Sequence, residues 1–267
     1  MAGQVAERGL VLLGCGKMGG AMLAGWLDGG LPAERVWVLD PKPSDWLQGQ
    51  GVNLNTDLPE RPAVALVAVK PQMMGEALPA MVALGGGETL VVSVAAGTPI
   101  ATFEAAFGQA TPIVRAMPNT PAAVARGITA IIGNGAATAA HLDLAEELLS
   151  AVGQVVRLET EDQIDAVTGL SGSGPAYVFH LIEAMAEAGV AQGLAPELAM
   201  RLARATVSGA GALVDASEES AEQLRVNVTS PNGTTQAGLE VLMAELPDLM
   251  ARTVAAATRR ATELRDG

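Results

Sequence analysis

The chain of 267 residues has a formal net charge of −13 and a pI near 4.5, which argues against nucleic acid as a partner. Its single cysteine, Cys15, excludes an intrachain disulfide, and the two histidines, His141 and His180, are too far apart in sequence to predict a metal site. The N-terminal sequence MAGQVAERG lacks the features of a secretory signal, and no apolar run has membrane-spanning length, so we expect a cytoplasmic protein without a membrane partner.

The N-terminal segment has the pattern strand, glycine turn, helix. The apolar run Leu10–Leu13 predicts a strand buried on both faces of a parallel sheet. Gly14, Gly16 and Gly19 then form GxGxxG, and helical spacing of apolar residues continues to Trp26. In this context the first glycine allows the sharp turn, the second allows backbone to approach a pyrophosphate, and the third allows close packing of helix and strand. The pattern predicts a dinucleotide site, against the alternative of a glycine turn with only a structural role.

A second expected strand, residues 35–39, ends at Asp40, about twenty residues after the last motif glycine. An acidic side chain at this place can bind the ribose 2′-hydroxyl of NAD, whereas Lys42 could hold the 2′-phosphate of NADP. The alternative is an ordinary turn formed by Pro41 and Pro43. We expect NADH to be used appreciably, with NADPH or NADH as the cofactor. Cys15, inside the glycine turn, is expected to be a small filler residue rather than a reactive thiol.

The remainder of the first half predicts a doubly wound α/β sheet. Further strands are expected at residues 64–69, 90–94, 113–116, 128–132 and 154–158, with helices at 72–84 and 141–152. The carboxyl ends of such strands are where a cofactor lies. The loop after residue 116 contains two prolines and leaves Asn119 and Thr120 as polar groups at the sheet edge. His141 is expected at the surface, and Gly153 is expected to end the second of these helices.

From Thr160 onward nearly everything is patterned as helix, so we expect one domain over residues 1–159 and an all-helical domain over 160–267. Several glycines interrupt the expected helix at 161–193, which indicates either close helix packing or approach to a ligand. His180 on this helix is expected to be a packed or interface residue. Pro196 is well placed to begin a helix reaching about Val214.

A loop carrying Ser230 and Gly233 leads directly into Thr234 and Thr235, which are expected to start a helix. The free N–H groups at such a helix entrance can bind a carboxylate. An ordinary serine and threonine cap explains the same residues, and the spacing does not decide between the two interpretations.

Five motifs in this order resemble the pyrroline-5-carboxylate reductase family over almost the whole chain. They are GCGKMG after the first strand, AVKPQ at 68–72, RAMPNTPA at 115–122, GLSGSGPAY at 169–177 and VTSPNGTT at 228–235. The resemblance implies an N-terminal Rossmann domain and a helical domain that forms a homodimer or larger homo-oligomer. It also implies hydride transfer from NADPH or NADH to the C=N carbon of 1-pyrroline-5-carboxylate, which gives L-proline.

The resemblance assigns roles by position. Expected cofactor-binding residues are Gly14, Cys15, Gly16, Lys17, Met18, Gly19, Asp40, Lys42, Ala68, Val69, Lys70, Pro71, Ala95, Ala96, Gly97 and Asn119. Expected substrate-binding residues are Glu218, Asn227, Ser230, Gly233, Thr234 and Thr235. Thr235 is the expected catalytic side chain, as hydrogen-bond partner or proton relay to the imine nitrogen. Leu58 lies near where relatives often have an asparagine that contacts the cofactor, so no role is transferred to it.

Two rival interpretations use the same glycine turn. A β-hydroxyacid dehydrogenase would use a lysine on a long inter-domain helix, and the segment 161–193 contains no lysine. A nonenzymatic dinucleotide sensor would use the glycine turn only to dock NAD, and would show no turnover.

Overall fold

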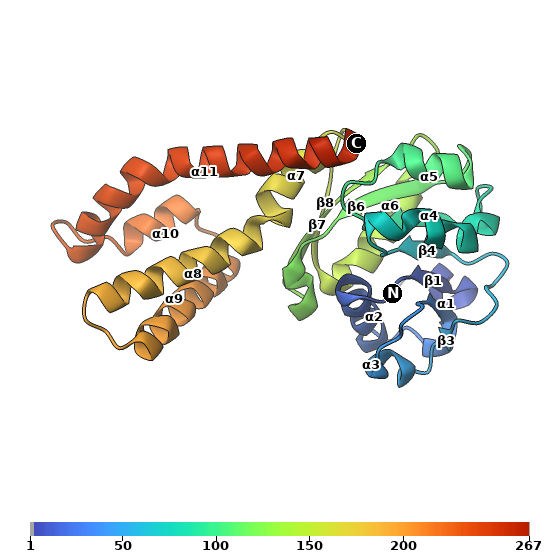
Figure 1. The fold of residues 1–267 in the computed structure, drawn as a ribbon, viewed down its shortest axis with the longest axis horizontal. Helices are drawn as coiled ribbons and strands as arrows, with labels where there is room; N and C mark the ends of the chain where they lie inside the picture. The colour runs from blue at the N-terminus through green and yellow to red at the C-terminus, as the bar shows by residue number, and fades with distance from the viewer. Residues whose placement is uncertain (1–2, 267) are drawn as a thin grey trace. The chain divides into compact units, whose positions relative to one another are not determined.

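A computed structural model describes residues 3–266 of the chain. The chain forms two compact units, the first from residues up to 172 together with those from 257 onward, and the second from residues 173–256 (Figure 1). The segment 160–172 makes contacts within the first unit. Asn119, for example, donates from Nδ2 to the carbonyl of Ser171 at 3.2 Å.

The first unit is built on an eight-stranded sheet of order β3-β2-β1-β4-β5-β6-β7-β8. Neighbouring strands run parallel except β6 and β7, which run antiparallel. The strands are β1 (Leu10–Leu13), β2 (Val36–Leu39), β3 (Asn53–Leu54), β4 (Val64–Val67), β5 (Leu90–Ser93), β6 (Ile113–Met117), β7 (Gly127–Gly133) and β8 (Gly153–Arg157). The predicted strands and the doubly wound α/β class are confirmed, apart from strand ends and the short strand β3, which was not predicted.

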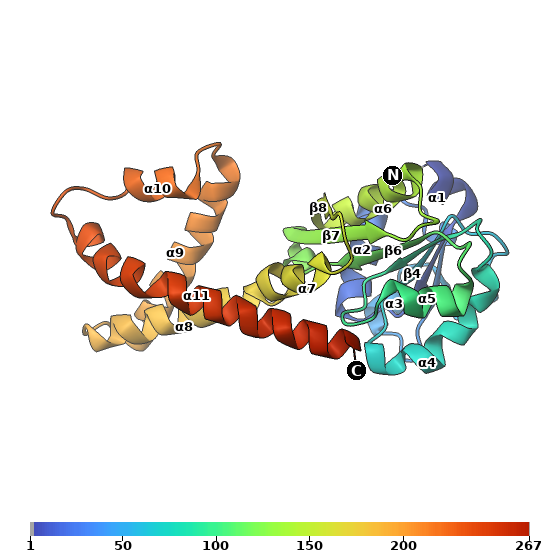
Figure 2. The same cartoon turned by 90° about the horizontal axis from the view of Figure 1, so that it is seen from above.

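The central strand β1 is buried on both faces because its apolar side chains alternate between two cores. Leu10 and Leu12 belong to the core formed with α2 (Lys17–Asp28) and α6 (Ala139–Leu149). Val11 and Leu13 belong to the core formed with α4 (Met74–Ala77) and α5 (Ile100–Phe107). Figure 2 shows α6 on one side of the strands and α4 and α5 on the other. On the first side, Nε1 of Trp26 donates to the carbonyl of Leu148 at 2.8 Å, which connects α2 to α6.

The helices of both units follow the expected periodicity in most places. They are α1 (Gly3–Arg8), α2 (Lys17–Asp28), α3 (Asp45–Gln48), α4 (Met74–Ala77), α5 (Ile100–Phe107), α6 (Ala139–Leu149), α7 (Gln163–Val167), α8 (Gly174–Ala191), α9 (Pro196–Ala216), α10 (Ala221–Asn227) and α11 (Thr234–Asp266). Of these, α1, α3 and α5 were not predicted, and α10 was expected only as part of a largely helical second half. Among residues 3–266, none of the helices is sufficiently long and apolar to cross a membrane.

The prediction of one helix over 72–84 was wrong. The single α-helical stretch α4 lies between 3₁₀ segments at Pro71–Met73 and Leu78–Leu84. Pro79 has no N–H to donate to a helical carbonyl four residues earlier, which disfavours continuation of the α-helix. The buried residues Leu78, Met81 and Leu84 recur every three positions, which is the period of a 3₁₀-helix.

The expected long helix over 161–193 is also divided. A π-helical segment, Thr168–Gly172, separates α7 from α8. A Cβ on Gly172 would lie 2.7 Å from Cε of Met117, so this glycine permits close packing against the end of β6. Pro175 lies in the first turn of α8, where its missing N–H leaves no helical bond unmade.

His141 lies near the surface at the start of α6, where its side chain also has a structural role. Its Nδ1 accepts a hydrogen bond from the backbone N–H of Thr138 at 3.1 Å, so it completes a capping box at the start of α6. The side chain is half-buried, and this burial lowers the pKa of His141. Gly153 follows the last turn after α6, as predicted.

In the second unit, α8 packs on α9 through small side chains, as the composition indicates. Ala186, Ala199 and Ala203 are its buried apolar cluster, and a Cβ on Gly189 would lie 3.2 Å from Cβ of Ala199. Many large apolar side chains of this unit remain exposed, Phe179 to 60 %. His180 is exposed within the unit rather than packed, with Nδ1 at 2.9 Å from Oε2 of Glu183.

Candidate active site

The glycine turn between β1 and α2 has the geometry of a phosphate cradle. Gly14 has φ of +87°, a conformation that glycine adopts far more readily than other residues. Its N–H donates to the carbonyl of Leu39 at 2.8 Å. A Cβ on Gly19 would collide with the carbonyl oxygen of Gly14, so only glycine allows α2 to approach the turn. Gly16, the residue before α2, has open space where a Cβ would stand. The free N–H groups in the first turn of α2 therefore lie beside a space that a phosphate group can occupy.

A pocket of about 630 Å³ adjoins this turn. It is lined by Cys15, Gly16, Lys17, Gly20, Ala24, Asp40, Lys42, Ser44 and Trp46. Five of the residues expected to bind the cofactor are thus brought together. The pocket suits the adenosine end of a dinucleotide, because it lies beside β1 and β2 and combines an indole ring, one carboxylate and two ammonium groups.

Asp40 joins the two loops that form this pocket. Its Oδ2 accepts from the N–H of Cys15 at 2.8 Å, and its Oδ1 accepts from the N–H of Lys42 at 2.8 Å. The side chain of Asn55 in turn bonds both backbone groups of Asp40. Since a carboxylate oxygen can accept more than one hydrogen bond, Asp40 both fixes the loops and retains capacity for a ribose hydroxyl.

Cys15 is a weakly acidic thiol in this setting. Burial, followed by the negative charge of Asp40, raises the pKa of the Cys15 thiol to about 11. The thiolate is the reactive form of cysteine, and a raised pKa disfavours it. This is consistent with the expectation that Cys15 is a small filler residue.

Lysine is rare in this chain, and two of its lysines line the first pocket. The sequence has three lysines, Lys17, Lys42 and Lys70. The first two line the pocket beside the glycine turn, and Lys70 is exposed just after β4. Positive charge is therefore placed where a dinucleotide phosphate would be bound.

A second pocket, of about 540 Å³, lies at the carboxyl ends of β4 and β5. It contains three of the expected cofactor residues, Pro71, Ala96 and Gly97. The full lining is Pro71, Gln72, Ala96, Gly97, Arg115, Asp165, Thr168, Ala261 and Leu264, all within the first unit. Cβ of Leu264, near the end of α11, lies 3.7 Å from the position of a Cβ on Gly97.

The other expected cofactor residues lie in the elements that form these pockets and not in their linings. They are Gly14, Met18, Gly19, Ala68, Val69, Lys70, Ala95 and Asn119. Both ends of the Asn119 side chain form hydrogen bonds within the first unit. Its Oδ1 accepts from the N–H of Ile128 at 3.0 Å, and its Nδ2 donates to the carbonyl of Ser171. Its side chain therefore connects the start of β7 to the π-helical segment.

The expected substrate residues all lie in the second unit, at the ends of α10 and the start of α11. Ser230 and Gly233 form a turn in which the N–H of Gly233 donates to the carbonyl of Ser230 at 3.1 Å. Thr234 and Thr235 are the first residues of the 33-residue helix α11, as predicted, and both are exposed. Their N–H groups precede the first full helical turn and are therefore donors available to a carboxylate.

Asn227 and Glu218 are also exposed. The Nδ2 of Asn227 lies 3.1 Å from both carboxylate oxygens of Glu219, and its Oδ1 accepts from Gln223 at 2.8 Å. Glu218 lies in the connection between α9 and α10.

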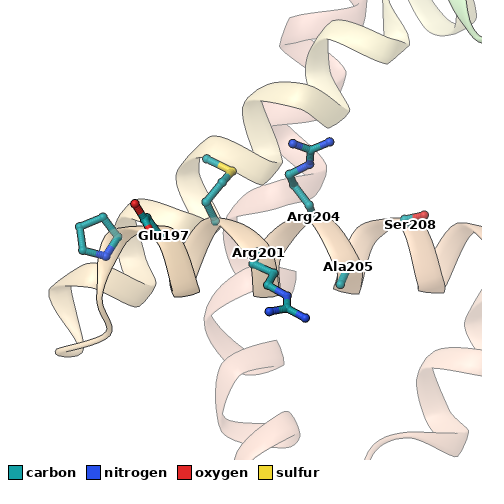
Figure 3. A pocket seen from close by; sticks show the side chains of 7 residues that line it. Glu197, Arg201, Arg204, Ala205 and Ser208 are labelled. Carbon is teal, nitrogen blue, oxygen red and sulfur yellow. The ribbon is translucent and has the colours of Figure 1, made fainter.

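A further pocket, of about 810 Å³, lies against α9 (Figure 3). Its lining comes from this one helix, and Figure 3 shows Arg201 and Arg204 pointing away from each other. Since these polar groups do not converge, the pocket is an open helix surface rather than a binding site.

Two charged residues that the sequence analysis did not single out, Arg115 and Asp165, are buried and line the second pocket. The available signal was an arginine inside the strand sequence IVRAM, where a buried charge requires partners. In the part of the chain that the structure describes, no group of three or more His, Cys, Asp or Glu side chains could hold a metal ion.

The sheet, the glycine turn and the helical second unit define a two-domain, dinucleotide-dependent oxidoreductase. Residues 161–264 match the family model for pyrroline-5-carboxylate reductase dimerisation, and residues 9–97 match that for coenzyme F420-dependent NADP oxidoreductases. The chain is 39 % identical to the pyrroline-5-carboxylate reductase of Pseudomonas aeruginosa over 96 % of both chains. It belongs to the pyrroline-5-carboxylate reductase family.

Solved structures agree with this assignment. A pyrroline-5-carboxylate reductase from Coxiella burnetii has a TM-score of 0.90 and 35 % identity, covering 96 % of this chain and 98 % of its own. The enzyme of Plasmodium falciparum, solved with NADP bound, has a TM-score of 0.82 and 27 % identity, covering 97 % and 99 % of the two chains.

Proposed function

We propose that this protein reduces 1-pyrroline-5-carboxylate to L-proline with NADPH or NADH, the last step of proline biosynthesis. The observation that carries the proposal is the cradle at Gly16, open to a phosphate and continuous with a pocket containing Lys17, Lys42 and Asp40. It occurs in a chain whose family membership is established over nearly its full length.

The reaction adds a hydride to the C=N carbon and a proton to the nitrogen, so the imine becomes a secondary amine. When bound, the reduced nicotinamide supplies the hydride. The remaining tasks of the protein are to orient the ring face and to keep the nitrogen protonated.

We assign the cofactor to the residues from Gly14 to Gly19, to Asp40 and Lys42, and to the loops 68–71 and 95–97. The two pockets support this assignment, because they contain residues from each of these segments. For Asn119 the hydrogen bonds within the fold favour a positioning role.

We assign the substrate carboxylate and ring to Ser230, Gly233, Thr234 and Thr235, with Asn227 and Glu218 beside them. The support is the start of α11, where successive N–H groups follow a tight turn. Thr235 is the proposed hydrogen-bond partner or proton relay for the imine nitrogen.

The protein is expected to act as a homo-oligomer through its helical domain, residues 160–267, with the dinucleotide-binding domain at 1–159. The dimerisation match over 161–264 and the exposed apolar side chains of α8 support this. We also propose a cytoplasmic location, which suits a chain whose single cysteine excludes an intrachain disulfide.

The decisive experiment mixes the purified protein with 1-pyrroline-5-carboxylate and either NADPH or NADH, and follows absorbance near 340 nm. We expect oxidation of both cofactors and formation of proline. Binding of cofactor without turnover would instead identify a nonenzymatic dinucleotide sensor.

The variant Thr235→Ala tests the assignment of the proton-relay side chain. We expect kcat/KM to fall about tenfold to a hundredfold, the loss of one or two hydrogen bonds in the transition state. Thr253→Ala makes the same change on α11, where the hydroxyl of Thr253 bonds the carbonyl of Leu249 at 2.8 Å, and should leave kcat/KM nearly unchanged. An unchanged kcat/KM in Thr235→Ala would remove this residue from the mechanism.

A further inference from the structure

Arg115 is a buried cation with donors left for a ligand. Its side chain is 2 % exposed, and its one hydrogen-bonding partner among the described residues is Glu161, with Nη1 and Oε1 2.7 Å apart. Glu161 is fixed in turn, because its Oε1 also accepts from the N–H of Ile100 at 2.8 Å. A guanidinium has five N–H donors, so Nε and Nη2 of Arg115 remain unused by the described chain.

Asp165 provides the complementary acceptor. It is 4 % exposed, and its Oδ2 takes both the hydroxyl of Thr262 at 3.0 Å and Nη1 of Arg265 at 2.9 Å. Its Oδ1 has no partner in residues 3–266. Within the same residues, no fully buried side-chain nitrogen or oxygen lacks a partner, so the unused atoms of Arg115 and Asp165 adjoin open space.

That space is the second pocket, which both residues line. It therefore presents hydrogen-bond donors from one buried side chain and an acceptor from another, with Ala96 and Gly97 as small neighbours. A primary carboxamide matches this pair, because its carbonyl accepts and its amide N–H donates. A pocket of about 540 Å³ also has the size of a small-molecule site.

The position of the pocket selects the carboxamide. The glycine turn and first pocket lie beside β1 and β2, whereas the second pocket follows β4 and β5 on the other side of β1 in the strand order. In a doubly wound sheet the two halves of a dinucleotide lie on either side of such a switch point. Building on the proposed function, we infer that Arg115 and Asp165 bind the carboxamide of the nicotinamide, Arg115 at its carbonyl and Asp165 at its N–H.

Direct binding to the wild-type protein tests this inference without turnover. Dissociation constants are measured by titration calorimetry for NADP⁺ and for its 3-acetylpyridine analogue, which keeps the carbonyl but has no amide N–H. We expect NADP⁺ to bind roughly tenfold to a hundredfold more tightly, because the analogue leaves Oδ1 of Asp165 unpaired. Equal binding of the two compounds would overturn the inference, whatever the behaviour of any variant.

Asp165→Ala should bring the ratio of the two dissociation constants close to one, mainly because the variant binds NADP⁺ more weakly. Arg115→Lys, which keeps a positive charge near Glu161, should weaken both compounds and leave the ratio high. The matched control is Asp162→Ala, since Asp162 also pairs with Arg265, at 2.8 Å, but is exposed and does not line the pocket. It should keep the wild-type ratio.

If Asp165 serves only as the partner of Arg265 and Thr262, Asp165→Ala should weaken the binding of both compounds by the same factor. That result would also overturn the inference. Thermal melts identify variants that fail to fold, for which the wild-type comparison remains decisive. The proposed function is tested separately by turnover. If the protein reduces the imine but binds NADP⁺ and the analogue equally, the proposed function holds and the assignment of Arg115 and Asp165 does not.

Discussion

Two glycines of the same turn differ in what a methyl group would meet. At Gly16 an added Cβ meets nothing within 4 Å, whereas at Gly19 it collides with the carbonyl oxygen of Gly14 and lies 3.3 Å from Cβ of Ala68. The fold therefore requires glycine at position 19, whereas at position 16 the proposed cofactor provides the reason for a glycine.

We expect Gly16→Ala to remain folded, with a loss of unfolding free energy below about 1 kcal/mol, and to bind NADP⁺ at least tenfold more weakly. Gly19→Ala should instead lower the melting temperature markedly, because two backbone segments must move apart. Thermal melts and titration calorimetry on the same samples separate the two effects. Equal melting temperatures for both variants would contradict this interpretation.

Lys42 provides the residue-level test of cofactor choice. It lines the first pocket beside Asp40, whose carboxylate is hydrogen-bonded to both loops. Lys42→Ala should raise the KM for NADPH about tenfold through loss of a charge-assisted contact to the 2′-phosphate, and leave the KM for NADH nearly unchanged. Lys42→Arg should retain the preference, because it keeps the charge. A similar rise for both cofactors would place Lys42 outside the phosphate-binding contacts.

At the scale of elements, helix starts depend on side chains whose chemistry periodicity does not reveal. The capping box of α6 uses His141 where glutamate or glutamine is usual. Burial lowers the pKa of His141, so the unfolded chain takes up a proton at a higher pH than the folded chain. Its contribution to stability is therefore lost as the pH falls below 6.5, where protonation removes the acceptor for the N–H of Thr138.

His141→Glu tests this, because glutamate accepts the same hydrogen bond and favours the positive end of a helix. Between pH 6.5 and 5 we expect the wild-type protein to lose about 0.5 to 1 kcal/mol relative to this variant, the usual contribution of a cap. Urea denaturation across that pH range measures the difference. Parallel pH profiles for the two proteins would show that the imidazole contributes nothing to the cap.

Strands and long helices were predictable because their apolar patterns repeat over several residues. The unbroken apolar run Leu10–Leu13 predicts a strand buried on both faces of the sheet. The helix that begins at Pro196 has both a proline in its first turn and a regular spacing of apolar residues. The stretch 72–84 differs from its prediction because apolar residues spaced by three suit either helix type, and only Pro79 disfavours the α-helix. The short strand β3 has two residues and leaves no pattern at all.

At the scale of the whole molecule, the motifs point to the segments that line the first pocket, whereas no motif points to the pairing found in the second pocket. Arg115 and Asp165 are 50 residues apart in sequence and come from a strand and a helix. Only tertiary structure brings them to one cavity, so no local pattern could pair them.

The exposed apolar side chains of the helical unit predict the assembly state. Phe179 on α8 is 60 % exposed, and a second copy of the chain would remove such side chains from water. Phe179→Glu should yield species near the 27.1 kDa of one chain in light scattering, whereas the wild-type protein should be at least a dimer. Val124→Glu is the matched control, because Val124 is 72 % exposed but lies in the first unit. Retention of the wild-type mass by Phe179→Glu would exclude this residue from the interface.

The small number of lysines, two of which line the first pocket while Lys70 is exposed after β4, has a practical consequence for chemical labelling. An acylating reagent selective for ε-amines would modify side chains of this protein only at these three positions. Occupancy could then be followed by peptide mass spectrometry, with protection by NADP⁺ reported separately by positions 17, 42 and 70.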